Sequence, residues 1–185
     1  MYRLIQPMYD EGCSPDEFEN GINNIKSEKY QELIDICFTS ASYFSLSKAP
    51  WTSCTKTDLA TELEPFLVKK VRLQKWFCYD FSSRDNFIEI NIYKSTNTAQ
   101  EILLKYFFDL FLQEQINGQM TSSTQTLEDL CFFTHNSLLL GTVTHEYMCH
   151  VYPPSETVKQ KIISTGKWQY SEDIPSEQIN IAQII

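Results

Sequence analysis

The stretch of sequence that decides the fold is residues 70–94, KVRLQKWFCYDFSSRDNFIEINIYK. Apolar and polar residues alternate on both sides of Ser83-Arg84-Asp85-Asn86, with Lys75 as the exception. Those four residues are typical of a turn. An alternation of period two is that of a strand with one buried face. We therefore predict a β-hairpin made of residues 70–82 and 86–94.

Segments with helical spacing flank this hairpin. Ser14-Pro15-Asp16-Glu17 forms a capping box, which predicts a helix start. Apolar residues recur three and four positions apart after this box, and again from about Glu28 and from Thr57. The widest apolar stripe in the chain predicts a helix over 98–116, and a last helix is predicted over 155–165.

A second pair of strands is predicted further along the chain. Residues 130–133 and 138–152 are rich in β-branched and aromatic side chains and are separated by a short polar turn. In a continuous strand over 138–152, His145 and Cys149 would lie on one face and Glu146 on the other.

Hairpins interrupted by helices are typical of an antiparallel α+β architecture. Residues 2–9 predict a short strand, and residues 176–185 are compatible with an edge strand. A length of 185 residues fits one domain. We expect a single α+β domain over 1–185, with a helical N-terminal part at about 14–67 and a sheet-forming part at about 70–152. The sheet should have about four to six strands, with helices packed mainly on one face.

The charge of the chain bears on its partners. Fifteen basic and 24 acidic residues give a net charge of −9, which repels phosphate backbones and argues against nucleic-acid binding. Residues 10–35 hold eight carboxylates against two lysines. Most acidic charge is expected to be solvated surface, and this segment could also steer a basic partner. The basic cluster of Lys69, Lys70, Arg72 and Lys75 predicts a solvated strand face.

The cysteines and the apolar runs indicate the cellular compartment in which the protein is expected. None of the six cysteines forms a C-x-x-C pair, and Cys78 and Cys131 sit inside apolar runs where a thiol behaves as a small hydrophobe. The first residues, Met-Tyr-Arg-Leu-Ile-Gln-Pro, lack the apolar segment of a secretory signal. We therefore expect free thiols and a cytoplasmic location. We also expect no membrane association, because no uninterrupted apolar run exceeds four residues.

One local string suggests metal chemistry. His145-Glu146-Tyr147-Met148-Cys149-His150 approaches the zinc motif H-E-x-x-H, but the position four after His145 is Cys149. The residues on either side of this string are typical of a strand, so we interpret the string as ordinary strand residues. We expect no stoichiometric zinc and no cofactor. No G-x-S-x-G motif or phosphate-binding loop occurs, so no catalytic residue is assigned. The alternative is a small hydrolase or metal-dependent enzyme that uses His145, Glu146 and Cys149.

Two strings carry a resemblance. LEDLCFF at 127–133 and LLGTVTHE at 139–146 resemble a pattern in small uncharacterised bacterial proteins that are similar to the immunity proteins of polymorphic toxins. Lys75-Trp76 and Ile92-Tyr93 also fit, so that the resemblance covers about residues 70–152.

The negative charge, the small size, the lack of a catalytic motif and this resemblance together lead us to expect a soluble cytoplasmic binding protein that inhibits a toxin or another basic partner protein. A regulatory or structural domain of a larger assembly remains a further alternative. The candidate partner-binding residues are Asp16, Glu17 and Glu19, followed by Trp76, His145 and Glu146.

Overall fold

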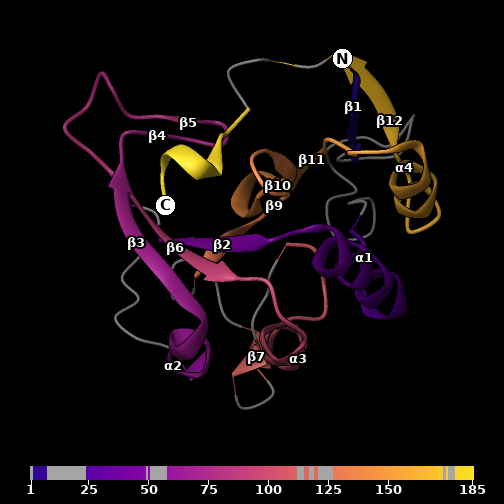
Figure 1. Ribbon diagram of the computed structural model, residues 1–185, viewed down its shortest axis with the longest axis horizontal. Helices are drawn as coiled ribbons and strands as arrows, with labels where there is room; N and C mark the ends of the chain where they lie inside the picture. Colours follow the sequence, from indigo (N-terminus) through magenta and orange to yellow (C-terminus); the bar gives the residue numbers. More distant parts are fainter. Residues whose placement is uncertain are drawn as a thin grey trace.

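A single large antiparallel sheet forms the centre of this computed structural model, which describes residues 2–7, 24–48, 50, 58–111, 115–116, 119–120, 127–172, 174 and 178–185 (Figure 1). Its eight strands are β1 (Tyr2–Ile5), β2 (Tyr43–Lys48), β3 (Leu67–Leu73), β6 (Ile88–Lys94), β9 (Glu128–Phe133), β10 (Leu138–Val143), β11 (Met148–Val151) and β12 (Gln169–Glu172). They lie in the order β12-β1-β11-β10-β9-β2-β6-β3, and every pairing is antiparallel.

Helices and two small hairpins complete the described elements. The helices are α1 (Ser27–Ser40), α2 (Asp58–Leu63), α3 (Asn97–Tyr106) and α4 (Glu156–Ile163), with the 3-10 turns η1 (Glu64–Phe66), η2 (Thr144–Glu146) and η4 (Ile181–Gln183). The hairpins pair β4 (Lys75–Trp76) with β5 (Tyr79–Asp80), and β7 (Gln115–Ile116) with β8 (Gln119–Met120). Among these helices, none is both long and apolar enough to cross a bilayer.

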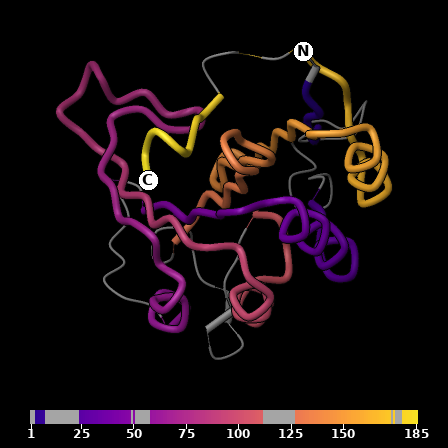
Figure 2. The backbone as a smooth tube through the Cα atoms, viewed as in Figure 1, coloured from indigo at the N-terminus to yellow at the C-terminus, as the bar shows by residue number. Residues whose placement is uncertain are grey.

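The two faces of the sheet are covered by different material. Leu130 and Phe132 point into a core shared with α1, α2, α3 and α4, which we call the helix-side core. Cys131 and Phe133, the alternate residues of β9, point into a second core with the β4–β5 hairpin and η4, which we call the hairpin-side core. The α+β class is therefore confirmed, and the helices pack on one face as expected. Figure 2 shows both ends of the chain in this arrangement, with β1 beside β12.

The predicted hairpin over 70–94 is present with one change. β3 and β6 pair antiparallel and bring Leu73 opposite Ile88, but the first strand ends at Leu73 and not at residue 82. The next residues fold back on themselves as the β4–β5 hairpin, whose turn holds Cys78 at a φ of 59°. The alternation of the sequence breaks at Lys75, the position at which this separate hairpin begins. The hairpin then packs over β10, where a β-carbon at Gly141 would lie 2.8 Å from the Phe77 ring.

The sheet has eight strands, and the expectation of four to six was too low. Compared with the six strands that the sequence offered, two are additional: β2, and the strand gained because 138–152 divides into β10 and β11. The Ser-rich segment at 43–48 forms β2 in the middle of the sheet, where Ser45 and Ser47 are fully buried. β1, the strand predicted over 2–9, and β12 form the far edge. Edge strand β12 lies at 169–172, whereas residues 178–185 form η4 and one isolated bridge in place of the edge strand considered at 176–185.

Two predicted elements are shorter in the structure. The strand predicted over 138–152 is divided by η2 and by Tyr147, whose φ of 49° is left-handed, so β10 and β11 pair with each other. The face assignment of His145 and Glu146 was therefore wrong, because both lie in the connection. The helix predicted over 98–116 ends at Tyr106.

The remaining helix predictions have mixed outcomes. α1 buries the predicted stripe, and α4 begins at Glu156 after the N-cap Ser155, whose hydroxyl accepts a hydrogen bond from the Val158 N–H. The helix predicted to start at Ser14 lies outside the described residues.

Candidate functional site

A buried polar cluster lies on the hairpin side of the sheet, at the start of β9. Its side chains come from β2, β5, β9 and η2, which are brought together only by folding. The members of this Asp129 cluster are Ser47, Tyr79, Glu128, Asp129, Thr144 and His145. Glu128 is 0% exposed and Asp129 is 1% exposed, so two adjacent carboxyl groups are withdrawn from water.

The backbone of Asp129 explains how this cluster forms. The pairing of β2 with β9 shifts register between Ser45 and Ser47, which marks a β-bulge. Asp129 lies at this irregularity with a φ of 56°, a left-handed conformation that Asp tolerates better than most residues. A bulge re-aims side chains beside it, and here the carboxyl of Asp129 faces Ser47 and the β4–β5 hairpin.

Three donors converge on the Asp129 carboxyl group. Oδ1 accepts a hydrogen bond from the Thr144 N–H at 2.7 Å, and Oδ2 accepts from the hydroxyls of Ser47 and Tyr79, each at 2.7 Å. The Asp129 N–H in turn donates to Thr144 Oγ1 at 2.9 Å. These two reciprocal hydrogen bonds between Asp129 and Thr144 hold β9 against η2. They therefore also fix the backbone position of His145, which follows Thr144.

Burial and hydrogen bonding act in opposite directions on Asp129. Desolvation raises the pKa of Asp129, while the hydrogen bonds from Thr144, Ser47 and Tyr79 lower it, and desolvation has the larger effect. Desolvation and the nearby Asp129 charge also raise the pKa of Tyr79. Tyr79 therefore stays a neutral hydroxyl that donates to Asp129.

His145 forms the solvent-facing side of the cluster. Its Nδ1 lies 4.0 Å from Oε2 of the buried Glu128 and 3.5 Å from the Tyr79 hydroxyl. Its Nε2 lies 3.6 Å from Oε1 of Glu146, whose side chain is 66% exposed. The His145 side chain is 29% exposed, so the imidazole connects the buried carboxyl groups with the surface.

The β4–β5 hairpin holds Tyr79 over the cluster. Lys75 and Asp80 form an ion pair of 3.0 Å across the hairpin. Asp80 also accepts hydrogen bonds from the hydroxyl and N–H of Ser82, and together with Lys75 these lower the pKa of Asp80 to about 2, with the Ser82 hydroxyl as the main cause. The Tyr79 ring stacks on the Phe81 ring with their centroids 5.7 Å apart, and this stacking orients the Tyr79 hydroxyl.

The structure gathers only some of the residues that the sequence singled out. His145 and Glu146 are neighbours at the edge of the cluster. Trp76 is 5% exposed and packs against Phe133 in the hairpin-side core, so it offers a partner almost no surface. Cys149 is fully buried in the helix-side core, on the other face of the sheet from the cluster. The predicted contacts Asp16, Glu17 and Glu19 lie outside the described residues.

Sequence reasoning missed Glu128 and Asp129 as site residues. One signal in the sequence pointed to these two residues: they lie directly before the apolar run Leu130–Phe133. A strand that is buried on both faces rarely begins with two charged residues. Ser47 and Tyr79 carry no comparable signal. They are 82 and 50 residues away from Asp129 in the chain.

A second feature is the outer side of the helix layer. α1 buries Tyr30, Leu33 and Ile34, and the opposite side of this helix exposes carboxylates four and three residues apart, at Glu28, Glu32 and Asp35. α3 lies beside α1 and α2 in Figure 1. Gln100 of α3 donates a hydrogen bond to Asp35, and Lys105 of α3 pairs with Glu62 of α2 at 2.6 Å.

This layer has a strong excess of negative charge. Within α1, α2, η1 and α3, all of which the structure describes, seven carboxylates stand against the two lysines Lys29 and Lys105. We call these carboxylates the acidic helix face: Glu28, Glu32, Asp35, Asp58, Glu62, Glu64 and Glu101. Three residues of the basic cluster, Lys69, Lys70 and Arg72, are exposed on edge strand β3, where Lys70 Nζ lies 4.0 Å from Oε2 of Glu64.

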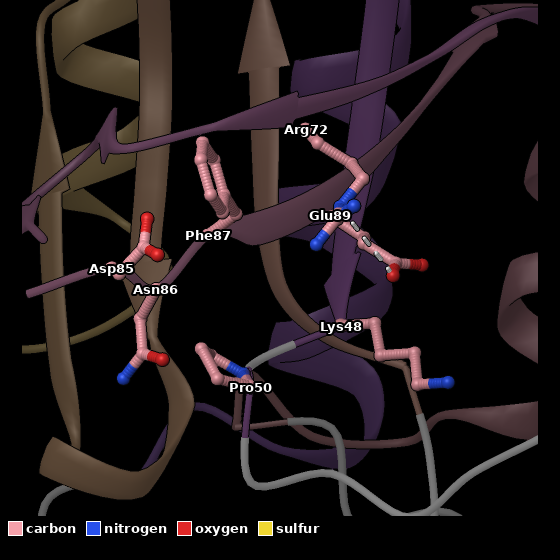
Figure 3. A pocket seen from close by; sticks show the side chains of 7 residues that line it. All are labelled: Lys48, Pro50, Arg72, Asp85, Asn86, Phe87 and Glu89. Atoms are coloured by element: carbon pink, nitrogen blue, oxygen red, sulfur yellow. Dashed lines mark ion pairs between the residues drawn. The ribbon is translucent and has the colours of Figure 1, made fainter.

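A pocket of about 260 Å³ lies between β3, β6 and the end of β2, and Figure 3 shows the side chains that line it. Arg72 lies 5.1 Å above the Phe87 ring, and its Nε is 4.0 Å from Glu89 Oε1. Lys48 and Asp85 add one charge of each sign. The charges of the pocket balance, so it favours neither an anion nor a cation.

Comparison with protein-family models, with curated proteins and with solved structures finds no match to this chain.

Proposed function

We propose that this chain is an acidic binding protein of the immunity type, which captures a basic partner protein on the acidic helix face. The observation that carries the proposal is the charge of that face, with seven carboxylates against two lysines on α1, α2, η1 and α3. The resemblance to immunity proteins over residues 70–152 supports the same class of function. A protein inhibitor needs no catalytic residue, only a surface of suitable shape and charge.

The fold makes this charged surface rigid. α1 is anchored by five buried side chains, and α2 and α3 are anchored in the same core by Leu59, Leu63, Ala99 and Leu103. Carboxylates on anchored helices keep their spacing, which reduces the ordering that a complex would require. A field of one sign raises the rate of encounter with an oppositely charged partner.

Association kinetics test the proposal. The probe is the purified protein encoded by the neighbouring gene, measured at two salt concentrations against the wild type and the Glu32→Lys/Glu101→Lys double variant. Both positions are exposed and lie on adjacent helices. We expect several-fold slower association of the variant at low salt, a smaller effect at high salt, and little change in dissociation, because exposed charges act mainly on encounter.

A matched control separates this surface from net charge alone. The Glu156→Lys/Glu172→Lys variant makes the same change in charge on α4 and β12, at residues outside the seven carboxylates of the acidic helix face. Equal slowing by the two double variants, or an unchanged rate in the first, would remove this face as the docking surface. Absence of any binding by the neighbouring gene product, together with failure to protect cells that express it, would overturn the immunity function.

A further inference from the structure

We propose that the Asp129 cluster is a binding site for a divalent transition-metal ion, with Glu128, Asp129 and His145 as ligands. One ligand atom from each of these three residues lies within 4.8 Å of the other two. The site is independent of the acidic helix face, and the proposal does not rest on protein binding. It also differs from the sequence motif at 145–150, since Glu128 and Asp129, and not Cys149, join His145.

The ligands are held by the fold and not by local sequence. Glu128 and Asp129 begin β9, and His145 follows Thr144, which exchanges two hydrogen bonds with Asp129. The backbones of all three residues are therefore fixed relative to one another before any ion binds. Preorganised ligands of this kind lose little freedom on coordination.

The charges of the site favour a cation. Two carboxyl groups at 0% and 1% exposure are costly to keep ionised in a protein interior unless positive charge compensates them. The three groups that donate to Asp129 are neutral: two hydroxyls and one backbone N–H. They favour the ionised form of Asp129 but supply no positive charge, whereas a divalent ion would supply it.

The second ring nitrogen of His145 has a carboxylate close to it. Nδ1 of His145 faces Glu128, and Nε2 lies 3.6 Å from the Glu146 carboxylate. Metal-binding histidines commonly use their second nitrogen to hydrogen-bond a carboxylate, which orients the ring and increases its basicity. Ser47 and Tyr79 orient Asp129 in the same way. The partly exposed His145 leaves a path for an ion to enter.

The donor set indicates the class of ion. Imidazole nitrogen with carboxylate oxygen suits Zn²⁺ and its first-row neighbours, whereas Mg²⁺ and Ca²⁺ prefer oxygen alone. Bonds of about 2.0–2.2 Å place ligand atoms roughly 3–3.5 Å apart around zinc. The present separations of up to 4.8 Å must therefore contract when an ion binds.

Calorimetric titration with ZnCl₂ tests the site on chelator-treated protein, with MnCl₂, MgCl₂ and CaCl₂ as comparisons. The wild type should bind one Zn²⁺ per chain. His145→Ala should bind at least tenfold more weakly, as should Glu128→Gln. His145 is partly exposed, so its variant should keep the wild-type circular dichroism even if Glu128→Gln does not fold.

Two control variants exclude binding elsewhere. His135→Ala removes an exposed histidine in the β9–β10 turn, and Cys78→Ser removes an exposed thiol. Both should bind zinc as the wild type does. Zinc binding that survives in His145→Ala, or that is lost in Cys78→Ser, would overturn the site. Mg²⁺ or Ca²⁺ affinity equal to that of Zn²⁺ would overturn the assignment to a transition metal.

Discussion

At the scale of single residues, the Asp129 cluster depends on contacts that short sequence windows do not contain. His145 and Glu146 were recognisable because they stand in a string that approaches a zinc motif. The residues that surround His145 are Glu128 and Tyr79, from other parts of the chain. The cysteine that completed the sequence motif lies instead in the core, and its reactivity can be tested directly.

We expect Cys37, Cys131 and Cys149 to react far more slowly than Cys78 with a thiol reagent. Burial raises the pKa of each of the three thiols, and only the thiolate reacts. Cys78 is exposed in the β4–β5 turn. Timed labelling with iodoacetamide and peptide mapping measure each site, and full reaction of all cysteines in denaturant serves as control. Fast native labelling of Cys149 would instead revive the enzyme hypothesis.

At the scale of elements, the main difference from expectation is where helices and strands end. The apolar stripe of the helix predicted over 98–116 continues past Tyr106, although the helix does not. Phe107 has an extended backbone and is 1% exposed, and Leu110 and Phe111 are also buried. Burial therefore persists where helical geometry has stopped, because these side chains still reach the helix-side core.

Phe107→Ala should destabilise the protein by about 3–5 kcal/mol, the usual cost of a cavity left by a buried phenylalanine. Phe108→Ala is the matched control, since the next residue is 36% exposed and should cost much less. Urea unfolding followed by circular dichroism gives both values. A loss below about 0.5 kcal/mol for Phe107→Ala would show that this segment does not pack as the structure has it.

At the scale of the whole molecule, the sheet is covered on both faces. The helices cover one face, and the β4–β5 hairpin with η4 covers the other. η4 is tied to the sheet by Ile181, which is fully buried, and by the hydrogen bond from Lys69 Nζ to the Ile184 carbonyl at 2.8 Å. The C-terminal residues thus contribute to the core that encloses the Asp129 cluster.

Ile181→Ala should cost about 2–5 kcal/mol, because it empties a site in the hairpin-side core. Hydrogen exchange should show the greatest loss of protection in the β4–β5 hairpin and η4, with the helices less affected. Ile185→Ala is the control, because Ile185 is 39% exposed. An even loss of protection over both faces would indicate that the two cores do not respond separately.

The sequence by itself determined the α+β class, the β3–β6 pairing and the positions of α1 and α4. Each follows from local periodicity, turn residues and helix caps, which act between neighbours in the chain. Only the tertiary structure decided the strand count, the division of 138–152 into two strands, and the cluster around Asp129. β2 lies between β6 and β9, and β1 between β11 and β12.

Such pairings join distant segments, so no local pattern specifies them. β2, whose four central residues are buried, shows this most clearly, because Ser45 and Ser47 look like loop residues until both faces of the strand are covered. The Asp129 site has the same origin. Its donors are polar side chains of ordinary appearance, and they acquire a role only because burial removes water and leaves Asp129 to bond with them.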